Sequence, residues 1–194
     1  MHLRWAALLA ILLAPPLALY GQAIPNGSAV SDIGRYEAGL NYNFIHANAP
    51  PGQCGCFSMN GGSGTFVMNF TPKWSAVADI MLAHAGNVNQ TGQNITIFNY
   101  LFGPRYSIRT SSRFVPYGEV MLGGAKEDVN IQFAINRNAF GFAAGGGVTT
   151  SLKPNLGWTI VEGDWIYTRI PNAVNNRQND VRIVTGLSYR FGVR

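Results

Sequence analysis

The sequence has few charged residues, few cysteines and histidines, and no long apolar run after its first 23 residues. Charged residues make up 12% of the 194-residue chain, which is unusual for a soluble domain. The 14 basic residues outnumber the 9 acidic ones, but they are scattered, so nucleic acid is not an expected partner. Without an apolar run of about 18 residues, the rest of the chain has no candidate for a membrane-spanning helix.

The first 23 residues have the order of a secretory signal peptide. His2 and Arg4 precede a short apolar run at 6–19, which is interrupted by Pro15 and Pro16 and followed by small residues up to Ala23. This run is too short to span a bilayer. We therefore expect an exported protein with a cleaved signal peptide at 1–23, a periplasmic lead segment at 24–34, a folded domain at 35–192 and a short tail at 193–194.

Alternating apolar and polar residues indicate β-strands along the whole exported part of the chain. The segments are longer than typical globular strands and match the roughly 9–11 residues that a tilted strand needs to cross a bilayer. Short and long connections alternate, as in bacterial barrels with short periplasmic turns and longer outer loops. The prediction is an all-β, eight-stranded antiparallel transmembrane up-and-down β-barrel, with strands at 35–46, 63–70, 74–86, 95–107, 114–125, 139–152, 157–170 and 179–191 and long loops at 47–62, 87–94, 126–138 and 171–178.

If the large apolar side chains face outward, the charged side chains of the strands face inward. The fifth strand is ambiguous, because Tyr117 and Met121 share the parity of Glu119. The interior of an eight-stranded barrel is just wide enough for side chains to fill it, and unpaired charges there are costly. We expect a lumen network that pairs Asp164 with Arg182 and Glu119 with Arg105, either as a structural core or as a narrow ion path. Its members are Glu37, Asp79, Arg105, Glu119, Glu162, Asp164, Arg182 and Arg190.

The closing run Leu187-Ser188-Tyr189-Arg190-Phe191, together with the signal peptide and the eight segments, resembles the small outer-membrane β-barrel family of the OmpA-like transmembrane-domain kind. The resemblance implies an outer-membrane location in a Gram-negative-type bacterium, with membrane lipids as surroundings. It also implies that Leu187, Tyr189 and Phe191 are the assembly signal read by the barrel-assembly machinery. The chain departs from the family pattern in that three residues follow Phe191.

The two cysteines, Cys54 and Cys56, lie in the first long loop. In an exported protein they suggest a disulfide, although a ring closed across a single residue is strained. Free thiols and an intermolecular link remain alternatives. No metal or cofactor is expected, because structural zinc sites need four ligands.

The sequence favours a structural or surface-interaction role, with the loops as the contact surface for an extracellular ligand. Loop 47–62, with Pro50, Pro51, Phe57 and Met59, is the strongest candidate. A narrow porin-like channel is the first alternative, and a lipid-modifying enzyme is the second. We expect no enzyme, because no serine lies near His84 in the sequence and a loop separates His46 from Ser58. A monomer is the expected state.

Overall fold

The computed structural model describes residues 34–48, 55–90, 92–110, 113–129, 137–170 and 176–192. The predicted signal peptide, the lead segment before Gly34, the tail at 193–194 and Cys54 lie outside these ranges. Within them the chain forms strands joined by turns and loops, and none of the described helices is both long and apolar enough to span a membrane.

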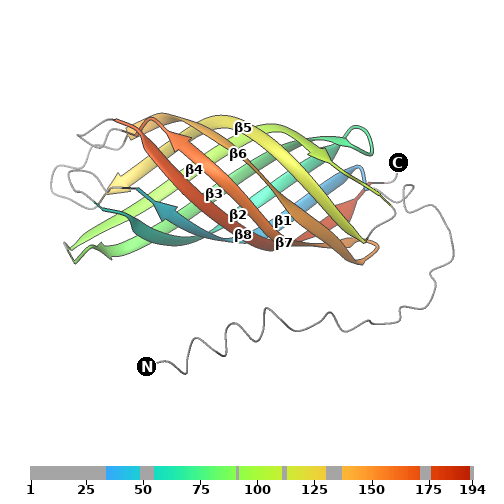
Figure 1. Cartoon of the computed structure of the whole chain (residues 1–194), viewed down its shortest axis with the longest axis horizontal. Coiled ribbons are helices and arrows are strands. Elements are labelled where there is room, and N and C mark those ends of the chain that lie inside the picture. Colours follow the sequence, from blue (N-terminus) through green and yellow to red (C-terminus); the bar gives the residue numbers. More distant parts are fainter. Residues whose placement is uncertain are drawn as a thin grey trace, which may run out of the picture.

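The eight strands form one closed antiparallel barrel in sequence order (Figure 1). Each strand pairs with the next along the chain, and β1 closes the barrel against β8, with Glu37 opposite Arg190. Closure leaves no strand edge unpaired, so the predicted fold class is confirmed. The strands are β1 (Tyr36–Ala47), β2 (Phe57–Asn69), β3 (Trp74–Val88), β4 (Gln93–Ser107), β5 (Phe114–Val129), β6 (Arg137–Lys153), β7 (Leu156–Thr168) and β8 (Gln178–Phe191).

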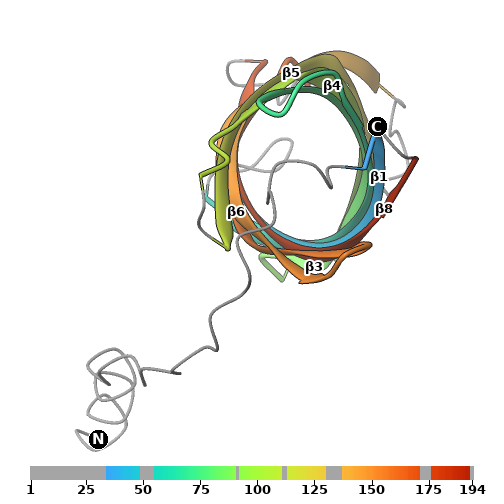
Figure 2. The same ribbon diagram turned by 90° about the vertical axis from the view of Figure 1, so that its right-hand side faces the viewer.

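The barrel has two distinct rims. The turn rim contains the connections 70–73, 108–113 and 154–155 and the outer ends of β1 and β8, and Figure 2 looks onto this end. The loop rim contains the connections 48–56, 89–92, 130–136 and 169–177. Short turns of bacterial outer-membrane barrels face the periplasm and longer loops face outside, which assigns the turn rim to the periplasm.

Three loops, including the 130–136 connection predicted at 126–138, are shorter than the sequence predicts, because the strands beside them are longer. β2 begins at Phe57 rather than at residue 63, and the connection between β3 and β4 spans 89–92 rather than 87–94. The predicted start of β2 was wrong because Gly61, Gly62 and Gly64 carry no side chains that reveal the alternation. Phe57 and Met59 are consequently buried inside the barrel, which corrects their prediction as exposed loop residues that contact a partner.

Large apolar side chains cover much of the outer surface of the barrel, and all described acidic side chains except Asp128 lie within. Leu40, Ile80 and Phe102 are exposed on the outside, whereas Asp79 and Asp164 are buried. The ambiguous fifth strand also follows this division: Tyr117, Glu119 and Met121 point inward, and Val120 and Leu122 point outward. The outer face therefore presents many apolar side chains, as lipid-facing strands require.

Candidate functional site

The centre of the lumen is organised around Arg182 of β8, whose side chain is 1% exposed. Its Nη1 donates to Asp79 Oδ1 at 2.8 Å, and its Nε donates to Asp164 Oδ2 at 2.8 Å. Its Nη2 lies 2.7 Å from the same Asp164 oxygen and 3.3 Å from Glu162 Oε1. One guanidinium thus binds three carboxylates from β3 and β7, which is the geometry that its planar set of five donors permits.

Arg105 of β4 forms a second cluster, and Glu162 joins it to the first. The Nε of Arg105 donates to Glu119 Oε2 at 2.5 Å, and its Nη2 lies 3.8 Å from Glu162 Oε2. The guanidinium also stacks over the ring of Tyr117, 4.1 Å from the ring centroid, and the Tyr117 hydroxyl donates to Glu162 Oε2. Glu162 therefore accepts from both clusters, so the two arginines belong to one network.

A third group of charges lies near the turn rim. Glu37 is 3.4 Å from Arg190 Nε and 3.8 Å from Arg109 Nη2, and it accepts a hydrogen bond from Asn69 at 3.0 Å. Arg190 also donates to Ser151 Oγ at 2.6 Å. Burial lowers the pKa of Arg109 from its ordinary value, and the carboxylate of Glu37 opposes this shift. Arginine nonetheless stays charged.

All eight residues of the predicted lumen network point into the barrel and take part in these contacts. Arg182 pairs with Asp164, and Arg105 pairs with Glu119. Both pairs lie inside the barrel. Two members of the network did not figure in the sequence prediction. Arg109 follows β4 but keeps the parity of Arg105 and Ser107, and Tyr117 shares the parity of Glu119, so alternation was the signal for both.

The network contains more carboxylates than guanidiniums. Asp79, Glu119, Glu162 and Asp164 face only Arg105 and Arg182 at the centre of the lumen. Oxygens of Glu119, Glu162 and Asp164 lie within 4.8 Å of one another, an arrangement in which acidic groups can hold a metal ion. The guanidinium groups of Arg105 and Arg182 already supply the positive charge in this cluster, because each of the three carboxylates contacts one of them.

Glycine residues on the inner face of β6 make room for this network. A Cβ on Gly145 would collide with the Asp164 side chain, and a Cβ on Gly147 would meet Glu162 at 2.9 Å. Glycine in a strand interior often marks such a close approach. The run Gly145-Gly146-Gly147 therefore admits the acidic side chains of β7.

The half of the lumen toward the turn rim contains two polar cavities. Glu37, Val67, Arg105 and Thr149 line both of them, one extends to Glu162, and the other reaches Arg109 and Arg190 at the rim. Their polar lining provides the partners that buried water needs. We refer to this part, from the turn rim to Glu162, as the turn half.

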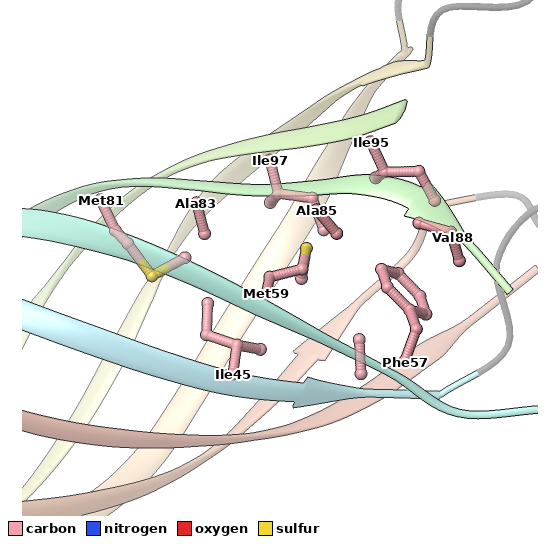
Figure 3. Packing of buried hydrophobic residues seen from close by; sticks show 10 residues of the cluster. Ile45, Phe57, Met59, Met81, Ala83, Ala85, Val88, Ile95 and Ile97 are labelled. Carbon is pink, nitrogen blue, oxygen red and sulfur yellow. The ribbon is translucent and has the colours of Figure 1, made fainter. Parts of the chain in front are cut away.

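The opposite half, from Arg182 to the loop rim, is filled by apolar side chains on its β1–β4 side (Figure 3). Met59 and Ile95 are fully buried, and across the lumen the polar side chains of Thr168, Gln178 and Asp180 are also buried. We refer to this part as the loop half. Its apolar cluster comes from β1 to β4 and consists of Ile45, Ala47, Phe57, Met59, Met81, Ala83, Ala85, Val88, Ile95 and Ile97.

The other predicted sites lie outside the lumen. Cys56 is exposed just before β2 and is not part of a disulfide in the described chain, and Cys54 lies outside the described residues, so their pairing stays a prediction. Leu187, Tyr189 and Phe191 are exposed on the outer face of β8. The ring of Phe191 lies 5.7 Å from that of Tyr36 across the β1–β8 seam. Their role as an assembly signal also stays a prediction.

The two histidines lie on the outer face near the loop rim. β1 and β2 place His46 opposite Ser58, with 3.4 Å between His46 Nδ1 and Ser58 Oγ. The expectation that a loop separates these residues was wrong, because β2 begins earlier than predicted. His84 Nδ1 lies 2.9 Å from Thr96 Oγ1. Neither histidine contacts a carboxylate of the described chain.

An apolar outer face around a filled polar lumen defines a membrane β-barrel of the outer-membrane class. The sequence matches the family described as the outer membrane protein beta-barrel domain over residues 5–191, so the chain belongs to this family. The predicted outer-membrane location is confirmed on the same basis. No curated protein matches the sequence.

Solved structures of bacterial outer-membrane proteins share the fold. Neisserial surface protein A aligns with a TM-score of 0.63 and 13% identity, covering 80% of this chain and 97% of its own. Ail, the attachment invasion locus protein of Yersinia pestis, aligns with a TM-score of 0.55 and 15% identity, covering 82% and 99%. OprG from Pseudomonas aeruginosa aligns with a TM-score of 0.55 and 14% identity, covering 83% and 97%.

Proposed function

We propose that this protein is a closed outer-membrane scaffold that presents its loop rim to partners outside the cell and does not conduct solutes. The observation that carries the proposal is the seal across the lumen. Arg182 with its three carboxylates lies at the centre, and in the loop half beyond it the apolar cluster of β1 to β4 lies across the lumen from the buried side chains of Thr168, Gln178 and Asp180. A solute path would have to displace both layers, and separating Arg182 from its carboxylates leaves buried charges uncompensated.

Recordings in planar lipid bilayers test the closed lumen. The wild-type protein is expected to give no stable conductance, whereas the triple variant Phe57→Ala, Met59→Ala, Met81→Ala removes the seal of the loop half and is expected to leak. The double variant Phe66→Ala, Met68→Ala serves as the control, because both side chains lie on the outward parity of the same strand β2. A large, stable channel formed by the wild-type protein contradicts the proposal.

The exposed charge of the loop rim supports an anionic partner. Lys126, Arg169 and Arg177 are exposed there, and Asp128 is the single exposed acid among all the side chains that the structure describes. Ail has been crystallised with the heparin analogue sucrose octasulfate, which supplies a probe for this surface. Loops and rims on a rigid scaffold are where binding residues concentrate.

Binding to intact cells tests the loop rim separately from the turn rim, which faces the periplasm. Cells that display the wild-type protein are expected to bind labelled sucrose octasulfate, and the variant Lys126→Gln, Arg169→Gln is expected to lose most of this binding. The variant Lys73→Gln, Lys153→Gln carries the same loss of charge on the turn rim and should bind normally. Equal binding by all three proteins would rule out an anion-binding loop rim.

We assign no catalytic role to the histidines. A nucleophilic serine is activated by a base that a third group orients. His46 reaches Ser58 at 3.4 Å, but no carboxylate in the described chain orients its ring. Unchanged lipid A in cells that overexpress the wild-type protein is the expected result, and a modification that disappears with His46→Ala or His84→Ala would overturn it.

A further inference from the structure

The turn rim carries exposed positive charge on every one of its junctions. Arg35 precedes β1 beside the end of β8, Lys73 lies in the β2–β3 turn, Arg113 in the β4–β5 turn and Lys153 at the start of the β6–β7 turn, and all four side chains are exposed. The turns lie around the circumference of the barrel (Figure 2). We call these four residues the cation ring.

The strands β1, β3 and β5 begin at the turn rim. The first residue of each is aromatic and directly follows a member of the cation ring. The pairs are Arg35-Tyr36, Lys73-Trp74 and Arg113-Phe114. Aromatic side chains at strand ends lie at the membrane–water interface. The preceding residue lies one step farther from the hydrocarbon, at about 3.3 Å per residue. The basic residue of each pair therefore lies one step beyond its aromatic neighbour, on the side away from the hydrocarbon.

Two of these aromatic residues, Tyr36 and Trp74, contact neighbouring side chains at the turn rim. Trp74 and Tyr106 meet edge to face with 4.9 Å between ring centroids, and the guanidinium of Arg35 lies 5.6 Å from the ring centroid of Tyr36. Trp74 and Phe114 are each 52% exposed, so these rings remain available to lipid.

The acidic residues of the described ranges are segregated from the cation ring. Seven acidic side chains lie inside the barrel, and the eighth described acid, Asp128, is at the opposite rim. No exposed acid therefore accompanies the cation ring in the described part of the chain. The seven inward acids are Glu37, Asp79, Glu119, Glu127, Glu162, Asp164 and Asp180.

We propose that the cation ring binds the anionic phospholipids of the periplasmic leaflet, one headgroup at each of its four junctions. The chemistry recognised is a phosphodiester without a compensating amine, such as that of phosphatidylglycerol. Charge complementarity selects the ligand, because a zwitterionic headgroup carries its own cation. Since the four groups lie on separate turns, they form separate sites.

Lipid selectivity in vesicles tests this proposal. The folded protein is placed in phosphatidylcholine vesicles that contain spin-labelled phosphatidylglycerol or spin-labelled phosphatidylcholine, and the immobilised fraction of each label is measured. A basic side chain near an anionic surface strengthens association about fivefold. The wild-type protein is therefore expected to prefer phosphatidylglycerol at these sites by about this factor, and high salt should reduce the preference.

The decisive variant carries Arg35→Gln, Lys73→Gln, Arg113→Gln and Lys153→Gln, and it is expected to lose the preference for phosphatidylglycerol. The variant Lys126→Gln, Arg169→Gln at the loop rim is the control and should retain it. Both variants change exposed residues, and urea unfolding shows whether each is folded. The proposal is overturned if the variant with four substitutions still prefers phosphatidylglycerol. It is also overturned if only the loop-rim variant loses this preference.

Discussion

The turn half and the loop half of the lumen stabilise the same barrel in different ways. In the turn half, Glu37, Arg109 and Arg190 pair loosely around polar cavities that reach the rim. In the loop half, apolar side chains from four strands pack against each other with almost no exposure. Arg182 lies at the boundary and is as buried as the apolar residues beyond it.

This difference indicates how an eight-stranded barrel can contain many charges and still be closed. Charged groups with water nearby tolerate imperfect pairing, because solvent screens them. A charged group at the boundary of a dry region must have all its partners, because desolvation is costly there. Arg182 has three carboxylate partners within 3.3 Å, whereas the ion pairs of Glu37 near the turn rim are 3.4 Å and 3.8 Å long.

Among the substitutions that test this difference, a change at Arg182 should lower the free energy of unfolding most. Arg182→Met leaves Asp79, Glu162 and Asp164 without their central cation, and removing one partner of a buried ion pair costs about 3–5 kcal/mol. The free energy of unfolding, measured by urea titration in lipid vesicles, should fall by this amount. The loss should shrink as the pH is lowered, because protonation removes the negative charge left unpaired.

Arg190→Met is the matched control on the same strand, because Arg190 contacts Glu37 at 3.4 Å beside the polar cavities. Its cost should be clearly smaller than that of Arg182→Met. Equal losses for the two variants would show that the two halves do not differ in hydration.

The next largest effect should come from the apolar seal. Met59 is fully buried in the loop half, whereas Met68 lies on the other face of the same strand β2. Met59→Ala should lower the free energy of unfolding by about 2–5 kcal/mol, because it leaves a cavity. Met68→Ala removes the same atoms from the outer face, where lipid can fill the space, and should cost less than half as much. Similar losses at both positions would contradict a tightly packed loop half.

The alternation of the strands was sufficient to predict the fold and the inward set of charges. It failed for Phe57 and Met59, because the glycines that follow them in β2 hide the pattern. The interactions among the charges were only partly predictable. Strand pairing brings Asp164 next to Arg182, but Asp79 reaches Arg182 from β3 across the lumen, and no pattern along the chain encodes that distance.

The contacts of Glu162 also could not be predicted from the sequence. Its inward position follows from parity, but its contacts with both Arg105 and Arg182 depend on the shape of the closed barrel. Arg109 was missed for another reason. It lies beyond the end of β4, where a turn was expected to break the alternation, yet its side chain bends back to Glu37.

Glu37→Gln should change the free energy of unfolding least, and this change should be the most sensitive to salt. Glu37 pairs with Arg109 and Arg190 at the hydrated end of the lumen, where solvent-screened pairs contribute up to about 1 kcal/mol. The free energy of unfolding should fall by about this amount at low ionic strength, and the difference from the wild-type protein should nearly vanish in high salt. Asp79→Asn removes a carboxylate held by Arg182 at the sealed end of the lumen, so its effect should not depend on salt. If the two variants respond to salt in the same way, ions and water reach the centre of the barrel as readily as its turn rim, and the division into a hydrated and a sealed half fails.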